Sequence, residues 1–188
     1  MFHIRAELPA DTSAVEHLND LGFGTDRKGR TVWRLRQGPV AEGLAFVADD
    51  PIDGRVLATI RFWQVDVGRA DAGQDISAVL LGPLAVCPTM QGQGLGRALV
   101  SHGLQAARDG GWDICLVSGE PSYYLPFGFE PAPPYGFEMP GPLKAGWLQV
   151  RDLKAGALDA LPRKGTRPIR PWRWVRGAGD VTALRAAG

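Results

Sequence analysis

The chain has 188 residues, 45% of them hydrophobic and 22% charged, which predicts one soluble globular domain with a substantial core. Its 21 Lys and Arg residues nearly balance 20 Asp and Glu residues, and a net charge of +1 does not favour a nucleic-acid partner. The sequence has no apolar run long enough for a membrane span, no signal-peptide pattern at its start, and two isolated cysteines, Cys87 and Cys115. These features predict a cytoplasmic protein with neither a membrane partner nor a metal.

The predicted elements begin with a strand at residues 2–8, followed by an amphipathic helix. Ser13 and Glu16 fit a capping box at the start of this helix, and Gly22 fits its C-terminal end. A second, shorter helix is expected within residues 27–36. The apolar face of the first helix is predicted to contain Val15, Leu18 and Leu21.

Three strands are predicted next, at residues 43–48, 55–67 and 76–86. The third is continuously apolar except at Gly82 and Pro83. Because both flanks remain strongly apolar, this interruption predicts a β-bulge inside a central strand and not an edge strand.

The second half of the chain predicts a long helix at residues 94–108, a buried strand at 112–117 and a short helix or turn at 121–127. Short strands are expected near Phe137 and at residues 147–150. This order predicts an α/β fold, with a mixed sheet covered by helices on both faces and one right-handed crossover through the long helix.

The most informative segment lies where the third strand ends and the long helix begins. Gly92, Gly94 and Gly96 recur at every second position. Such a turn exposes a row of backbone N–H groups at a helix N-terminus, and glycine lets a pyrophosphate approach the backbone closely. Arg97 stands where a dinucleotide-binding fingerprint needs its third glycine, and the Gly-Lys-Ser/Thr of a P-loop is absent.

Residues 91–96 resemble the signature Q/R-x-x-G-x-G/A of the GNAT acetyltransferase superfamily, and the preceding strand end at 84–88 resembles the family too. A second resemblance lies downstream, where Tyr123 and Tyr124 precede Gly128 and Phe129. The chain is thereby identified as a member of this superfamily over roughly residues 2–150. The resemblance implies an N-acetyltransferase that uses acetyl-CoA, with CoA bound between two splayed parallel strands of a central mixed sheet.

The resemblance also implies a set of coenzyme-binding residues. The backbone of Leu84, Ala85 and Val86 would hydrogen-bond the pantetheine arm, and an N–H among them would polarise the thioester carbonyl. The glycine-rich turn and Arg97 would hold the pyrophosphate. The members of this turn are Gln91, Gly92, Gln93, Gly94, Leu95 and Gly96.

The amine acceptor would attack the thioester directly. Tyr124, five residues before Phe129, matches the position of the family's general acid; the alternative is a packed aromatic residue whose hydroxyl bonds to the backbone. Glu120 is a candidate base and Asp75 a second, although either could be a solvated surface carboxylate, and the family also has members without a dedicated base. The acceptor pocket would lie between the loop that joins the first two helices and the late strands.

The sequence predicts an acetyltransferase domain at residues 1–160 and a basic, tryptophan-containing segment at 161–188 that packs on the same domain or on a partner in a homodimer. Contact of this segment with nucleic acid is the alternative. The acceptor, a small-molecule amine or a peptide amine, is not identified. Three other functions stay open: transfer of another acyl group, acetylation of protein N-termini, and a catalytically silent CoA-binding regulator.

Overall fold

The structure is a computed structural model that describes residues 2–68, 76–161 and 165–172. Its strands are β1 (His3–Ala6), β2 (Val40–Asp49), β3 (Val56–Asp66), β4 (Ala78–Val86), β5 (Ile114–Ser118), β6 (Glu130–Pro131), β7 (Phe137–Glu138), β8 (Leu148–Asp152), β9 (Arg167–Pro168) and β10 (Arg170–Pro171). Within the described residues, the main sheet has the order β1-β2-β3-β4-β5-β8-β6, with β10 also paired to β3, and β7 and β9 form a separate pair. The predicted mixed sheet is confirmed.

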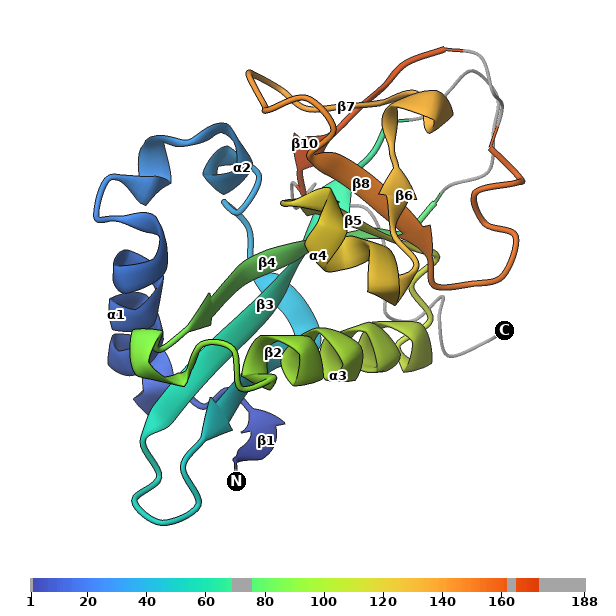
Figure 1. The fold of residues 1–188 in the computed structure, drawn as a ribbon. Coiled ribbons are helices and arrows are strands. Elements are labelled where there is room, and N and C mark those ends of the chain that lie inside the picture. The colour runs from blue at the N-terminus through green and yellow to red at the C-terminus, as the bar shows by residue number, and fades with distance from the viewer. Residues whose placement is uncertain (1, 69–75, 162–164, 173–188) are drawn as a thin grey trace, which may run out of the picture.

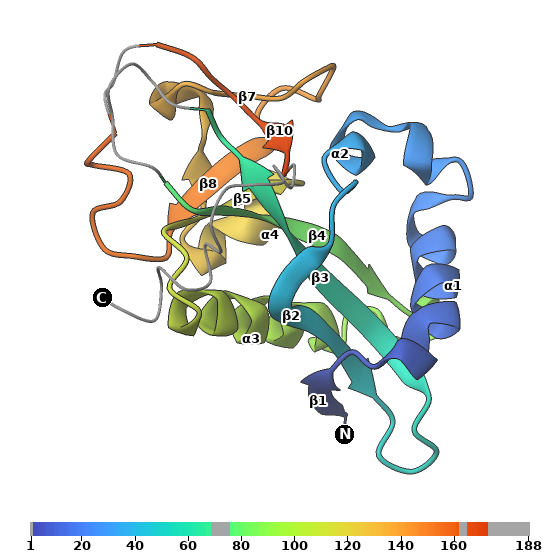
Figure 2. The same ribbon diagram turned by 180° about the vertical axis from the view of Figure 1, so that it is seen from behind.

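Helices cover both faces of this sheet, as predicted (Figures 1 and 2). They are α1 (Thr12–Phe23), α2 (Thr31–Arg34), α3 (Leu95–Asp109) and α4 (Pro121–Tyr124). Helix α1 lies so close to β4 that a Cβ added at Gly22 would be 3.7 Å from the Cβ of Ala85. Helix α3 packs on the opposite face, where Gly103 lies against the ring of Phe62. The crossover from β4 through α3 leads to β5, which pairs with β4 in parallel.

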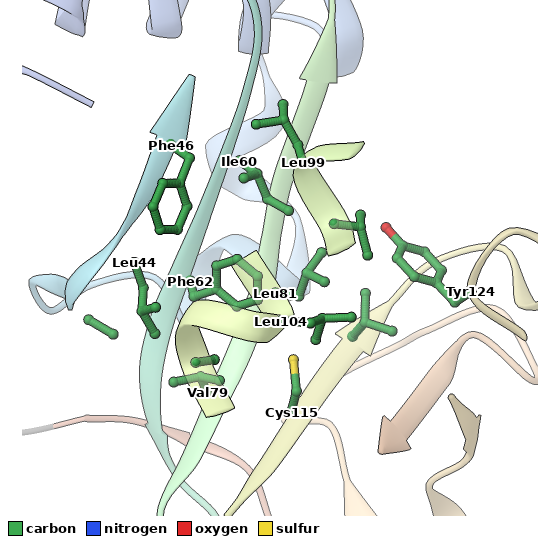
Figure 3. Close-up of a cluster of buried hydrophobic side chains, with 14 of the residues drawn as sticks. Leu44, Phe46, Ile60, Phe62, Val79, Leu81, Leu99, Leu104, Cys115 and Tyr124 are labelled. Atoms are coloured by element: carbon green, nitrogen blue, oxygen red, sulfur yellow. The ribbon is translucent and has the colours of Figure 1, made fainter. Parts of the chain in front are cut away.

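The core beneath α3 joins side chains from the central strands to the apolar side of the helix (Figure 3). Ile60, Phe62 and Leu99 are completely buried there. A second cluster, on the other face of the sheet, includes Leu80 and Leu116 and extends to Ile169 near the described C-terminal end. Each such side chain contributes roughly 1.5–3 kcal/mol when it is fully withdrawn from water.

The first helix differs from its prediction at both ends. It begins at Thr12, and the Glu16 carboxylate accepts hydrogen bonds from the Arg27 and Arg61 side chains, at 2.6 and 3.2 Å, so it caps nothing. The helix ends at Phe23, and its C-cap is Gly24, whose φ is 81°, two residues beyond Gly22. Leu21 is 52% exposed, because a spacing of three residues falls short of a 3.6-residue turn and rotates the third position off the buried face.

The break in β4 is a bulge, as predicted. Ile60 of β3 pairs with Leu84, whereas Phe62 pairs with Leu81, so β4 carries one residue more than β3 across this interval. On its other side β4 pairs with β5 only from Ala78 to Leu81. Beyond the bulge the two parallel strands separate, which is the splayed arrangement that the family resemblance implies.

The described part of the C-terminal segment returns to the fold of its own chain. Arg170 pairs with Asp66 of β3, and Ile169 is completely buried. Trp172 is partly exposed, and Trp174 lies outside the described residues. The division of the chain at residue 160, and a homodimer through the last segment, stay predictions.

Candidate active site

A cavity of ≈ 450 Å³ lies where β4 and β5 have separated, at the N-terminal end of α3. All residues that the sequence assigned to the coenzyme line it except Gln93. The side-chain amide of Gln93 turns back and donates to the Thr89 carbonyl, at 3.3 Å. Phe23, at the end of α1, also lines this cavity, and no motif pointed to it.

The glycine-rich turn leaves its backbone uncovered. Gly92 and Gly94 have φ angles of 78° and 87°, and a Cβ at either position would meet nothing within 4 Å. Gly94 is the N-cap of α3, so the first N–H groups of a 15-residue helix face this opening. The turn therefore combines exposed donors with the positive end of the helix dipole, which favours a bound anion.

The open edge of β4 offers further donors. The N–H groups of successive strand residues point to alternate sides, and the Cys87 N–H donates to the Leu57 carbonyl on β3, at 2.8 Å. The pairing is regular from Val86 back to Leu84. The N–H groups of Val86 and Leu84 therefore point away from β3, into the gap that β5 has left. Two backbone N–H groups can thus donate hydrogen bonds to carbonyl oxygens of a ligand in this gap.

Tyr124 lies at the margin of the core (Figure 3) and lines not this cavity but a second one that adjoins it. Its ring packs edge-to-face between Tyr123 and Phe129, with centroids 5.0 and 5.6 Å away, and Gly119 leaves room for it. Within the described residues its hydroxyl takes part in no hydrogen bond, so the predicted alternative of a backbone-bonded hydroxyl has no support there. Burial raises the pKa of Tyr124, which keeps the phenol protonated at neutral pH.

A second cavity, of ≈ 990 Å³, meets the first at Phe23, Leu84, Arg97 and Tyr123. Its walls include the segment around α2 and the loop before β8, the region in which the sequence predicts an acceptor pocket. Glu120 lies at its exposed rim, where it caps α4 without a side-chain hydrogen bond. Asp75, the other candidate base, lies outside the described residues.

Arg36 also lines the second cavity, and sequence reasoning missed it. Its guanidinium lies over the ring of Trp33, with Cζ 4.4 Å from the ring centroid. Burial lowers the pKa of Arg36 to about 9, which still leaves it charged at neutral pH. The sequence gives no signal for Arg36, because it lies outside any motif. Only the folded structure shows that its side chain has no acidic partner among the described residues.

The described residues contain no helix long and apolar enough to cross a membrane. They also contain no group of three or more His, Cys, Asp or Glu side chains placed to hold a metal ion.

Residues 41–131 match the family model of the acetyltransferase (GNAT) domain. The uncharacterised N-acetyltransferase YhbS of Escherichia coli K12 is 33% identical over 159 residues, which cover 84% of this chain and 91% of YhbS. The chain belongs to the GNAT family of N-acetyltransferases. A second E. coli K12 relative, the uncharacterised N-acetyltransferase YjhQ, is 30% identical over 176 residues, or 90% of each chain.

Two solved GNAT structures extend the comparison to the coenzyme. The crystal structure of E. coli YhbS in complex with CoA superposes with a TM-score of 0.75 at 30% identity, covering 93% of both chains. A GNAT acetyltransferase of Brucella melitensis in complex with acetyl-CoA gives a TM-score of 0.62 at 26% identity, covering 93% of this chain and 97% of the other. Each of these two structures therefore matches nearly the whole length of this chain.

Proposed function

We propose that this GNAT protein transfers the acetyl group of acetyl-CoA to a primary amine by direct attack. The observation that carries the proposal is the continuity of the gap beside β4. The first cavity joins the uncovered glycine-rich turn to the β4 edge at Leu84 and Val86, and the adjoining second cavity extends from Leu84 to Tyr124. The coenzymes in the YhbS and Brucella structures support acetyl-CoA as the co-substrate.

Each part of the gap has one task in this proposal. The amides of residues 91–96 and the Arg97 guanidinium hold the pyrophosphate. The β4 edge holds the pantetheine, and one of its free N–H groups stabilises the oxygen that becomes negative when the amine attacks the thioester carbon. The C–S bond then breaks, and Tyr124 donates its proton to the departing thiolate. Tyr124 regains a proton from solvent.

The attacking amine must lose a proton as its bond to carbon forms. Glu120 is the carboxylate that lines the acceptor cavity in the described residues, and we assign it this proton, directly or through one water. Its exposed position keeps it in contact with solvent, so the proton can leave after each turnover. Glu120→Gln should therefore lower kcat/KM most below the pH at which the amine deprotonates on its own.

Thermal unfolding tests the coenzyme site. A ligand that binds the folded state alone raises Tm, so acetyl-CoA should do so, and NADH and ATP at equal concentration should do less. Gly94→Glu should abolish the shift, because it places a carboxylate where the pyrophosphate binds. Gly111→Glu is the matched control: Gly111 also has a positive φ, of 73°, and open space around it, but it follows the far end of α3. A larger shift with NADH than with acetyl-CoA would contradict the proposal.

Release of CoA with a panel of amines tests the transfer. Acetylated amine in the mass spectrum, in step with released CoA, is the expected result. Tight binding of acetyl-CoA without transfer to any small amine or peptide amine would instead favour the silent regulator. Faster reaction with a longer acyl-CoA would mean that the protein transfers another acyl group, with the same roles for the site residues.

A further inference from the structure

Arg36 lacks the partner that a buried guanidinium normally has. Its Nε is fully buried and unpaired, and within the described residues the Arg36 side chain takes part in no hydrogen bond and no ion pair, although the backbone N–H donates to the Trp33 carbonyl. It lies against the β4 bulge, since a Cβ at Gly82 would fall 2.7 Å from its Nη2. Leaving a buried charge without a partner is costly, so such a group marks a place where a partner binds.

Arg27, which contacts the same tryptophan, differs from Arg36 in having acidic partners. Arg27 also lies over the ring of Trp33, with Cζ 4.7 Å from the ring centroid, but it is held by ion pairs of 2.6 Å to Glu16 and 2.8 Å to Asp20. The fold therefore neutralises one of the two guanidinium groups that contact Trp33. It leaves the other, Arg36, facing the acceptor cavity.

The charges around the cavity point the same way. Four further cations add positive charge to its lining, and among the described residues the one carboxylate that lines it is Glu120, at the exposed rim. These cations are Arg30, Arg34, Arg97 and Lys144. A planar guanidinium matches the two oxygens of a carboxylate or phosphate group. The remaining walls include the rings of Phe23, Trp33 and Trp147, which suit an apolar body.

We propose that the acceptor is a small amine that also carries an anionic group, a carboxylate or a phosphate, which Arg36 binds. Because Arg36 lies beside the β4 bulge and Tyr124 lines the same cavity, this contact holds the acceptor with its amino group near the thioester. The inference rests on the proposed acetyltransferase function and names the class of acceptor for that site.

Matched acceptors test the proposal. Phenylalanine and phenethylamine differ by a carboxylate, and phosphoethanolamine and ethanolamine differ by a phosphate. Comparing kcat/KM within each pair measures the effect of that anionic group. In at least one pair the anionic member should have the higher kcat/KM, by about tenfold or more, as expected for a charge-assisted contact. Arg36→Met should remove this preference and leave the neutral member within about threefold. Arg36→Lys, which keeps the charge but loses the planar fork, should fall between the two.

Arg108→Met is the control, because it removes an exposed arginine from the far end of α3, and it should change neither member. The Tm shift with acetyl-CoA checks that each variant is folded. Equal or higher kcat/KM for the neutral member of both pairs in the wild-type protein would overturn the proposal. So would a preference that survives in Arg36→Met.

Calorimetry separates this inference from the acetyltransferase proposal. With CoA bound, phenylacetate should bind the wild-type protein at least about tenfold more tightly than phenylacetamide, and Arg36→Met should lose that difference. If no amine releases CoA but phenylacetate binding depends on Arg36, the transfer proposal fails and the anion site stands. Equal binding of phenylacetate to wild type and Arg36→Met overturns the anion site, whatever the activity.

Discussion

Alanine at Gly96 would separate the coenzyme-binding role of α3 from its structural role. Alanine gains roughly 0.5–1 kcal/mol over glycine inside a helix. Its Cβ would lie 2.7 Å from the Tyr123 hydroxyl and 3.5 Å from a methyl carbon of Val86, on the floor of the coenzyme cavity. Tyr123 is partly exposed and can turn aside, so the free energy of unfolding should change by less than about 1 kcal/mol. With acetyl-CoA bound, the added methyl group would be overpacked against the ligand, which costs about 1–3 kcal/mol. The acetyl-CoA Kd should therefore rise roughly tenfold to hundredfold.

Gly103→Ala is the matched variant in the same helix. Its Cβ would lie 2.4 Å from the nearest atom of the completely buried Phe62 ring, away from the coenzyme. It should lower the free energy of unfolding by about 1–3 kcal/mol, or about 2–4 °C in Tm for each kcal/mol, and leave the acetyl-CoA Kd of the folded protein unchanged. Calorimetric titration and thermal unfolding of both variants measure the two effects. Wild-type affinity in Gly96→Ala, or weakened binding with normal stability in Gly103→Ala, would refute the reasoning.

Three further perturbations address the acid, the stability at low pH and the C-terminal segment. Tyr124→Phe should lower kcat by about 10²-fold or more with little change in acetyl-CoA affinity, and an unchanged kcat would leave Tyr124 as packing alone. Arg5 donates to both Asp11 carboxylate oxygens, at 2.6 and 2.9 Å, and lowers the pKa of Asp11 below its ordinary 3.8. The stability from this pair is present above that ordinary pKa and is lost as the pH falls through the lowered one, so Asp11→Asn should lower Tm at pH 7 and lose its effect in strong acid. An equal loss of Tm at both pH values would contradict this assignment. Ile169→Ala should lower the free energy of unfolding by about 2–5 kcal/mol with no change in acetyl-CoA affinity, and an unchanged Tm would remove the segment from the core.

The sequence predicts the parts of this fold that depend on local chemistry. Glycines at alternate positions before an amphipathic helix are readable because the backbone there needs positive φ at Gly92 and Gly94. The bulge is readable because Gly82 and Pro83 interrupt an otherwise apolar strand. In both cases the constraint acts on the residue's own backbone, and the residue type reports it directly.

Features that depend on distant partners were not readable in the same way. Glu16 fits a capping box by spacing, yet Arg27 and Arg61 bind its carboxylate. Leu21 continues an apolar pattern but falls outside the contact between α1 and the sheet. Arg36 is distinguished by the partners that its side chain lacks within the described part of the chain, and only the structure, which places its guanidinium against Gly82 in the β4 bulge, makes that visible.

The Tyr124 hydroxyl lies between these two cases. The motif around Phe129 indicates the residue, but the freedom of its hydroxyl follows from the packing of Gly119, Tyr123 and Phe129 around the ring. The catalytic roles of Tyr124 and Glu120 stay predictions until turnover is measured.

The most direct test of the central claim is a single-turnover reaction of the protein-bound acetyl-CoA complex with a carboxylate-bearing amine, followed by mass spectrometry of the amine. The proposed mechanism predicts acetylated amine and free CoA in equal amounts, formed at least about 10²-fold more slowly by Tyr124→Phe. Release of CoA without acetylated amine, or equal rates in the two proteins, would contradict it.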